Sequence, residues 1–242
     1  MAKTLALATF TLLASAAAVA DPGYYLVTVY ENEGEANIDY RYWTVKMPRS
    51  TQTVWPEIGF GYGVTKRWYT ELYASYIGSN NMATKLSSLN WQNDYLLTQG
   101  QYDFDLALHT NLVHNYGGGG QAFEYGPALQ TEVGRVQLNA NLVFERGFDV
   151  PGGSGPTQLK YQWQAKYRWK PAFQFGLQGF GELGDWDHWA PHNRQSHRAG
   201  PMIAGALPIG ATDSFKYQAA FLKGSVYGSR GHMFSMRLQY VY

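Results

Sequence analysis

The chain has 242 residues, of which 45% are hydrophobic, 16% aromatic and only 15% charged, whereas a typical soluble domain is about 25% charged. Its 19 Lys and Arg residues nearly balance its 18 Asp and Glu residues, which leaves no excess charge to hold a nucleic acid. The absence of Cys excludes a disulfide framework, a thiolate nucleophile and a zinc–thiolate site.

Residues 1–20 have the features of a secretory signal peptide. Lys3 supplies a positive charge, an apolar run follows from Leu5 to Ala17, and Ala18-Val19-Ala20 fits the small-residue cleavage pattern. A membrane helix is the alternative, but the run is short for a span and no positive flank follows it. No later apolar run approaches the roughly 20 residues of a transmembrane helix. We therefore expect export and a mature chain that begins near Asp21.

Residues 21–36 precede the first long alternating segment. Tyr24 to Tyr30 is rich in aromatic and β-branched side chains and could form an extra strand. The alternative is an N-terminal extension, either periplasmic or inserted into the lumen of a barrel. The even strand number of single-chain bacterial barrels favours the extension.

Residues 37–242 consist of segments in which polar and apolar side chains alternate with a period of two. From Leu159 to Trp169, for example, apolar and aromatic residues alternate with Lys, Gln and Arg. Each segment has about ten residues, enough to cross a bilayer as a strand tilted near 45°. The expected strands are 37–46, 53–63, 68–77, 88–97, 102–113, 123–132, 136–145, 157–169, 172–183, 198–207, 214–223 and 232–242. The sequence thus predicts an all-β fold, a transmembrane antiparallel up-and-down β-barrel with twelve strands.

The connections between these strands alternate in length. Short links are expected at 64–67, 98–101, 133–135, 170–171 and 208–213. Longer Gly-, Asn- and Ser-rich links are expected at 47–52, 78–88, 114–122, 146–156, 184–197 and 225–231. Outer-membrane barrels have this asymmetry between periplasmic and external connections. A soluble β-sandwich or lipocalin-like barrel is the alternative, but it has no reason to place Trp and Tyr at both ends of its strands.

The final segment carries an aromatic face made of Phe234, Leu238, Tyr240 and Tyr242. It resembles the C-terminal β-signal of the bacterial outer-membrane β-barrel superfamily. The resemblance implies residence in the outer membrane, outer-membrane lipid as surroundings and the barrel-assembly machinery as a partner during biogenesis. It points to no narrower family.

The inward parity carries ionisable residues whose sign changes along the chain. From Glu57 to Glu145 these residues are acidic apart from His109, and from Lys160 onward they are basic apart from Glu182. We expect an acidic wall facing a basic wall, as at porin constrictions. The candidate selectivity residues are Glu57, Glu71, Asp94, Asp103, Asp105, Lys160, Lys166, Arg168 and Arg237. The favoured function is a passive channel for small polar or charged solutes, with the solute unknown. The alternative is a structural or adhesion barrel whose opposite charges pair across a plugged lumen.

Other kinds of site have weaker support. An outer-membrane lipid-modifying hydrolase would need a Ser and a His within reach of each other, but Ser235 and His232 have opposite parity and no Gly-x-Ser-x-Gly element occurs. His188, His192 and His197 share a loop with Asp side chains, which makes a metal site conceivable. A solvated external loop is the favoured reading. We expect no enzyme activity, no metal and no cofactor.

Overall fold

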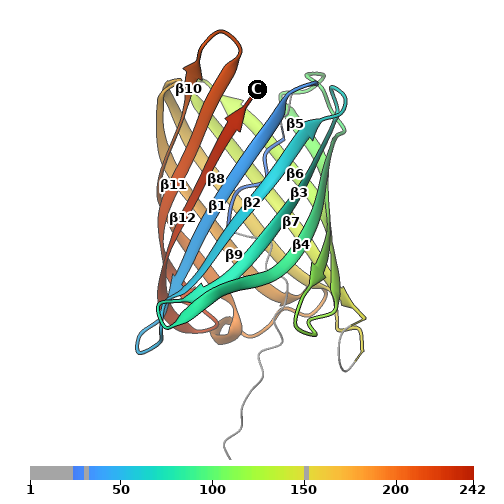
Figure 1. The fold of residues 1–242 in the computed structure, drawn as a ribbon, viewed down its shortest axis with the longest axis vertical. Coiled ribbons are helices and arrows are strands. Elements are labelled where there is room, and N and C mark those ends of the chain that lie inside the picture. The colour runs from blue at the N-terminus through green and yellow to red at the C-terminus, as the bar shows by residue number, and fades with distance from the viewer. Residues whose placement is uncertain (1–23, 30–32, 150–152) are drawn as a thin grey trace, which may run out of the picture.

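The computed structural model describes residues 24–29, 33–149 and 153–242, and it is a closed antiparallel barrel of twelve strands (Figure 1). This confirms the predicted all-β barrel and its strand number. The strands are β1 Ala36–Lys46, β2 Thr53–Gly63, β3 Trp68–Ser79, β4 Met82–Leu96, β5 Phe104–Asn115, β6 Gln121–Val133, β7 Val136–Phe148, β8 Gln158–Lys170, β9 Phe173–Asp185, β10 Ser196–Ile209, β11 Asp213–Val226 and β12 Ser229–Val241.

The barrel closes where β1 pairs with β12, from Asn37 opposite Val241 to Lys46 opposite His232. At the end of this seam, Ala36 and Tyr242 exchange two backbone hydrogen bonds of 2.9 Å each. Closure leaves no strand with an unpaired edge. An unpaired edge would be costly in hydrocarbon, where each unsatisfied backbone group costs several kcal/mol.

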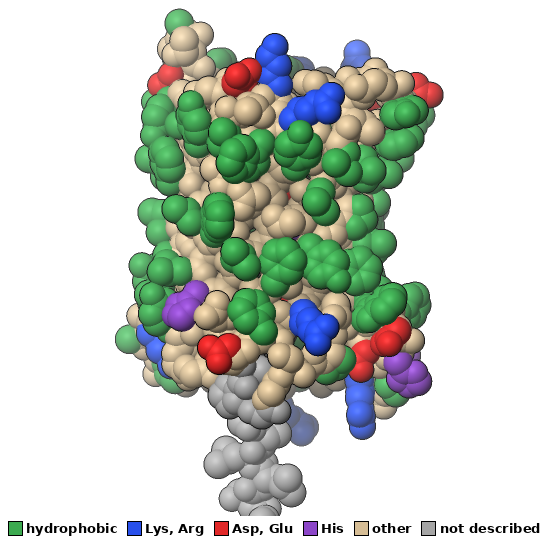
Figure 2. Space-filling view, turned by 90° about the vertical axis from the view of Figure 1, so that its right-hand side faces the viewer, with side chains coloured by type: hydrophobic (Ala, Val, Ile, Leu, Met, Phe, Trp, Pro, Cys, Tyr) green, Lys and Arg blue, Asp and Glu red, His purple; other side chains and the backbone are tan. Residues whose placement is uncertain are grey.

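The outer surface is apolar and the inner surface is polar, which is the inverse of a soluble barrel. On β3, for example, Leu72 is 64% exposed whereas the adjacent Glu71 is 1% exposed. Figure 2 shows hydrophobic side chains over the body of the barrel, with charged side chains gathered towards its two ends. No helix in the described residues is long and apolar enough to cross a membrane.

Several connections differ from those expected. Residues 78–88 were predicted to form a long link, but β3 and β4 extend through most of this range and turn at Asn80 and Asn81. Their pairing continues as far as Ser79 opposite Met82, through register shifts between Ser75 and Tyr76 and between Ile77 and Ser79, as where a β-bulge adds a residue to one strand. The predicted link 225–231 is likewise reduced to Tyr227 and Gly228, and the predicted short link 98–101 spans 97–103.

The two ends of the barrel are therefore less asymmetric than the sequence indicates. We call the end that carries the β1–β2 and β9–β10 connections the long-loop end, since the latter connection runs from residue 186 to residue 195. The opposite end, which carries Ala36 and Tyr242, is the short-turn end. External connections are usually the longer ones in outer-membrane barrels.

Candidate functional site in the barrel lumen

Residues 24–29 lie inside the barrel and outside its sheet. Tyr24, Tyr25, Leu26, Val27 and Val29 are each at most 6% exposed, and none of them belongs to a strand. Figure 1 shows this part of the chain as a blue trace within the barrel. We call residues 24–29 the luminal segment.

Side chains from several strands hold the luminal segment. The Val27 N–H donates to Gln162 Oε1 at 3.1 Å, and Asn141 Nδ2 donates to the Val27 carbonyl at 2.9 Å. On β4, Gln92 Oε1 accepts a hydrogen bond from the Tyr25 hydroxyl at 2.8 Å. Because β4 and β8 stand on different sides of the barrel, the segment bridges the lumen.

The segment also runs along the barrel axis. Its Tyr24 hydroxyl donates to Glu182 on β9 at 2.5 Å, and Glu182 is itself bonded by Tyr227 in the β11–β12 turn at the long-loop end. At its other end, Val29 belongs to a buried apolar cluster with Leu96, the last residue of β4 at the short-turn end. Residues 24–29 therefore occupy much of the length of the lumen.

A cluster of four charged side chains on β1, β3 and β12 contacts the segment. Arg41 Nη2 lies 2.5 Å from Glu71 Oε2 and 2.8 Å from Asp39 Oδ2, and Arg237 Nη2 lies 2.7 Å from Asp39 Oδ2. The Arg41 guanidinium carbon is 3.7 Å from the centre of the Tyr25 ring, a cation–π distance. This group, the Asp39 cluster, binds the segment through the face of Tyr25.

A second cluster, formed by Arg198 and Glu182 with two aromatic side chains, contacts Tyr24. Arg198 Nη2 lies 2.7 Å from Glu182 Oε1 and also donates to the Tyr24 hydroxyl, and the Arg198 guanidinium carbon is 4.0 Å from the Tyr24 ring centre. The same ring packs edge-on against Trp43 and Phe180, with centroids 4.8 and 5.5 Å away. Tyr24 thus has apolar, cation–π and hydrogen-bond partners together.

Other luminal charges pair with one another or with neutral polar side chains. Lys160 Nζ lies 2.5 Å from Glu145 Oε2, and His109 Nδ1 lies 2.6 Å from Asp94 Oδ1. Asn111 Nδ2 donates to Glu124 Oε2 at 2.8 Å. All these side chains belong to buried residues, whereas side chains that line a water-filled pore would be exposed to solvent. These pairs join neighbouring strands of the wall, and residues 24–29 occupy space inside it.

The predicted selectivity residues occupy three kinds of position. Glu57, Glu71, Asp94, Lys160 and Arg237 face the lumen and are buried. Lys166, Arg168 and Asp105 are half-buried near the short-turn end, where Arg168 pairs with Glu132 at 2.6 Å. Asp103 was expected on the luminal wall, but it lies in the exposed turn before β5, because that strand begins two residues later than predicted.

Several residues that hold the luminal segment were not among the predicted site residues, including Tyr24, Tyr25, Asp39, Arg41, Glu182 and Arg198. Arg198 is the first residue of the predicted strand 198–207 and shares the parity of Met202 and Ala204, both of which are buried. Applying the parity rule at that position would have placed it in the lumen.

The other sequence candidates do not form catalytic or metal geometry. The Ser235 hydroxyl donates to the Tyr24 carbonyl inside the lumen, whereas His232 has the outward parity of the exposed Phe234. Both ring nitrogens of His197 are engaged, by Tyr161 at 2.8 Å and Gln195 at 2.7 Å. Within the described ranges, no three His, Cys, Asp or Glu residues are grouped to hold a metal ion. That the protein is not an enzyme stays a prediction.

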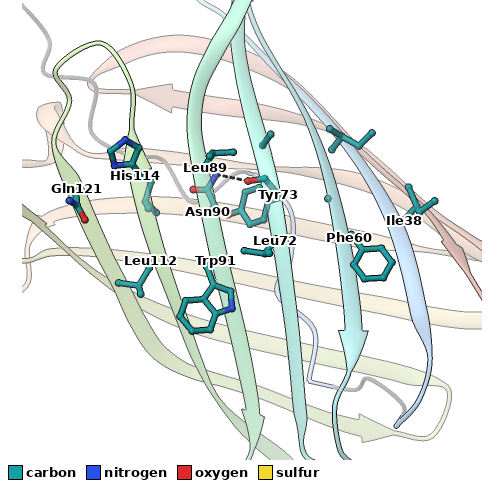
Figure 3. Close-up of a pocket in the computed structure, with 14 residues that line it drawn as sticks. Ile38, Phe60, Leu72, Tyr73, Leu89, Asn90, Trp91, Leu112, His114 and Gln121 are labelled. Carbon is teal, nitrogen blue, oxygen red and sulfur yellow. Dashed lines mark hydrogen bonds between the residues drawn. The ribbon is translucent and has the colours of Figure 1, made fainter.

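A hollow of about 770 Å³ lies on the outer wall over β1 to β6 (Figure 3). Its lining includes Ile38, Phe60, Leu72, Trp91 and Leu112, which are exposed apolar side chains. Polar groups beneath them form hydrogen bonds within the wall. For example, Asn90 Nδ2 donates to the Tyr73 carbonyl at 3.4 Å. This hollow suits hydrocarbon rather than a polar solute.

A closed antiparallel barrel with an apolar exterior and a polar interior is the architecture of bacterial outer-membrane barrels. Solved structures with this fold include the NanC porin, with a TM-score of 0.57, 9% sequence identity, and coverage of 83% of this chain and 98% of that one. The translocator domain of the autotransporter NalP from Neisseria meningitidis has a TM-score of 0.51, 9% identity, and coverage of 87% and 89%. No protein-family model and no curated protein matches the sequence. The structural neighbours are outer-membrane β-barrel proteins, and at these identities the likeness is one of fold.

Proposed function

We propose that this protein is an outer-membrane channel for small polar or charged solutes whose lumen is closed by residues 24–29. The observation that carries the proposal is the attachment of the luminal segment. It fills the lumen but is held by side chains of the wall rather than by the strand pairing that holds the barrel together.

The luminal segment contacts the wall but belongs to none of its strands. Three of its backbone hydrogen bonds go to the side chains of Gln162, Asn141 and Ser235, and breaking these three bonds would leave the pairing of the twelve strands intact. The side chains it leaves behind include polar ones that can take up water, such as Gln162 and Asn141, and apolar ones that release would uncover, such as Trp43 and Phe180.

The wall that release would expose has charges of both signs. Glu57, Glu71, Asp94 and Glu145 lie on β2, β3, β4 and β7, whereas Lys160, Arg198 and Arg237 lie on β8, β10 and β12. We propose that these groups orient dipolar solutes when the lumen is open, since charges at a narrow polar constriction are only partly screened. The solute itself is not specified by these groups.

We also propose that the protein is exported by a signal peptide and inserted into the membrane by the barrel-assembly machinery. Residues 1–20, which lie outside the described residues, would be the signal peptide, and the outward aromatic face of β12 would be read by the barrel-assembly machinery. The apolar band on the outside of the wall supports a location in outer-membrane lipid.

A structural or adhesion barrel with a permanently filled lumen is the second candidate. It is favoured by the buried ion pairs, such as Lys160 with Glu145, because pairs of this kind specify geometry more than they add stability. In that case the luminal segment would be a fixed part of the core.

Liposome swelling separates the two candidates. We expect slow uptake of small sugars and amino acids by liposomes that contain the wild-type barrel, and faster uptake with the Tyr24→Ala/Tyr25→Ala variant. Equal and negligible uptake by both proteins, with folded barrels verified by circular dichroism, would favour the structural candidate.

A further inference from the structure

Outward-facing basic side chains gather at the long-loop end over β11, β12 and β1. Lys46 on β1 is directly opposite His232 on β12, and His232 is directly opposite Lys223 on β11. Arg230 follows on the outward parity of β12, nearer the tip of the β11–β12 hairpin. We call Lys46, Lys223, Arg230 and His232 the basic rim patch.

The basic rim patch faces away from the lumen. Lys46 shares the parity of Ile38 and Tyr40, which are 47% and 37% exposed, and Lys223 shares that of Phe221, which is 43% exposed. Lys223 and Arg230 are themselves exposed. Lys223 and Arg230 therefore stand on the surface that surrounds the barrel, whereas Lys46 is half-buried and its Nζ donates to the Ser50 carbonyl.

No acidic side chain balances the patch on these strands. Over β10, β11, β12 and β1, all of which are described, the acidic residues are Asp39, in the lumen, and Asp213, at the short-turn end. In the part of the chain that the structure describes, no ion pair involves Lys46, Lys223 or Arg230. The patch is a local excess of positive charge on an otherwise apolar wall.

The patch adjoins an aromatic row at the level expected for a membrane interface. One outward step closer to the middle of the wall, Phe234 on β12 lies opposite Phe221 on β11. The Phe221 ring is 5.8 Å from the His232 ring and 5.6 Å from Lys223 Nζ. Aromatic side chains with cations just beyond them are typical of the boundary between hydrocarbon and lipid headgroups.

We propose that the basic rim patch binds the phosphorylated headgroup of an anionic lipid in the leaflet at the long-loop end. The row from Lys46 to Lys223 spans two strand spacings, roughly 10 Å, so it can contact a headgroup that carries more than one phosphate. The acyl chains would lie along Phe221 and Phe234. This inference rests on the proposed membrane location of the barrel and is independent of solute passage.

The test is native mass spectrometry of the folded full-length mature protein in detergent with diphosphorylated lipid A or phosphatidylcholine. The test variant is Lys46→Gln/Lys223→Gln/Arg230→Gln. The matched control is Lys66→Gln/Arg135→Gln/Lys170→Gln, which removes three exposed cations from the short-turn end. Because each cation near an anionic headgroup contributes measurably to binding, we expect the test variant to bind lipid A at least about tenfold more weakly and the control to bind like wild type.

Three results would overturn the proposal: wild-type binding of lipid A no tighter than of phosphatidylcholine, unchanged binding by the test variant, or equal weakening in the control. If inorganic phosphate alone displaced lipid A, the ligand would be free phosphate and the proposal of a lipid ligand would be wrong. Circular dichroism and heat-modifiable gel mobility report separately on the barrel. Failure of wild type to fold with lipid would refute the proposed function as well, whereas folded variants with unchanged binding refute this inference alone.

Discussion

The central carbon of the Arg41 guanidinium on β1 lies 3.7 Å from the centre of the Tyr25 ring, while Arg41 Nη2 contacts Asp39 and Glu71. One wall residue thus joins the ion cluster to the luminal segment. Arg237 reaches the same ring from β12 at 5.6 Å. The closure of the lumen and the seam between β1 and β12 are therefore stabilised by the same side chains.

Replacing Arg41 should be costly. Arg41→Gln leaves Asp39 and Glu71 buried with one cation fewer, and breaking a buried pair in this way costs about 3–5 kcal/mol. Urea unfolding in lipid vesicles, followed by tryptophan fluorescence, measures the loss. The control is Arg168→Gln, whose pair with Glu132 is 37% and 43% exposed at its side chains and should contribute about 0–1 kcal/mol. Equal losses in the two variants would contradict this account of the Asp39 cluster.

The wall itself is intolerant of side chains at certain glycines. A Cβ at Gly126 on β6 would lie 1.9 Å from the Leu142 carbonyl oxygen of β7, so Gly126→Ala must displace backbone. We expect a loss of stability of at least about 1–3 kcal/mol and a lower yield of heat-modifiable barrel. Gly155→Ala, which meets no atom within 4 Å, is the control. A normal yield for Gly126→Ala would show that β6 and β7 are more widely separated than described.

The last residue of the seam should matter for assembly. Tyr242 is 48% exposed on the outward face and bonds Ala36 through its backbone. Tyr242→Asp places a charge beside lipid at this junction, so we expect less barrel in the outer-membrane fraction, with Tyr242→Phe close to wild type. Normal membrane levels of the Asp variant would refute a role for this aromatic face in assembly.

Charges at the short-turn end should set ion preference once the lumen is open. Lys166 and Arg168 are half-buried there on β8, Asp105 is half-buried at the start of β5, and Asp103 lies in the turn before it. In the Tyr24→Ala/Tyr25→Ala background, Lys166→Glu/Arg168→Glu should shift selectivity towards cations, and Asp103→Asn/Asp105→Asn towards anions. Reversal potentials under a salt gradient measure both shifts. Identical potentials in all three proteins would exclude these residues from the solute path.

Most of the wall could be predicted from the sequence because lipid and lumen impose opposite polarities on successive side chains. β2 has the predicted bounds, and β1 differs by one residue. The prediction was wrong where that constraint weakens, as at residues 78–88, which pair as strand beyond the apolar band. Asp103 was misplaced for the same reason, since near a rim both faces of a strand meet water.

The contents of the lumen were harder to predict. The even strand number favours an extension over an extra strand for the run that begins at Tyr24, but it does not show whether that extension enters the lumen, because periodicity does not show what a segment contacts. Its contacts join residues that are far apart in the chain, such as Val27 and Gln162, and such contacts cannot be predicted from the local sequence.

Single-channel conductance in planar bilayers tests the central claim most directly, that residues 24–29 close the lumen. Wild-type barrels should show little or no conductance, and Tyr24→Ala/Tyr25→Ala barrels should show frequent openings, because the substitutions remove the rings held by Arg41 and Arg198. The control Tyr102→Ala/Tyr116→Ala, which alters aromatics that are 63% and 44% exposed, should behave like wild type. A large, steady wild-type conductance that the Tyr24 and Tyr25 substitutions leave unchanged would contradict the claim.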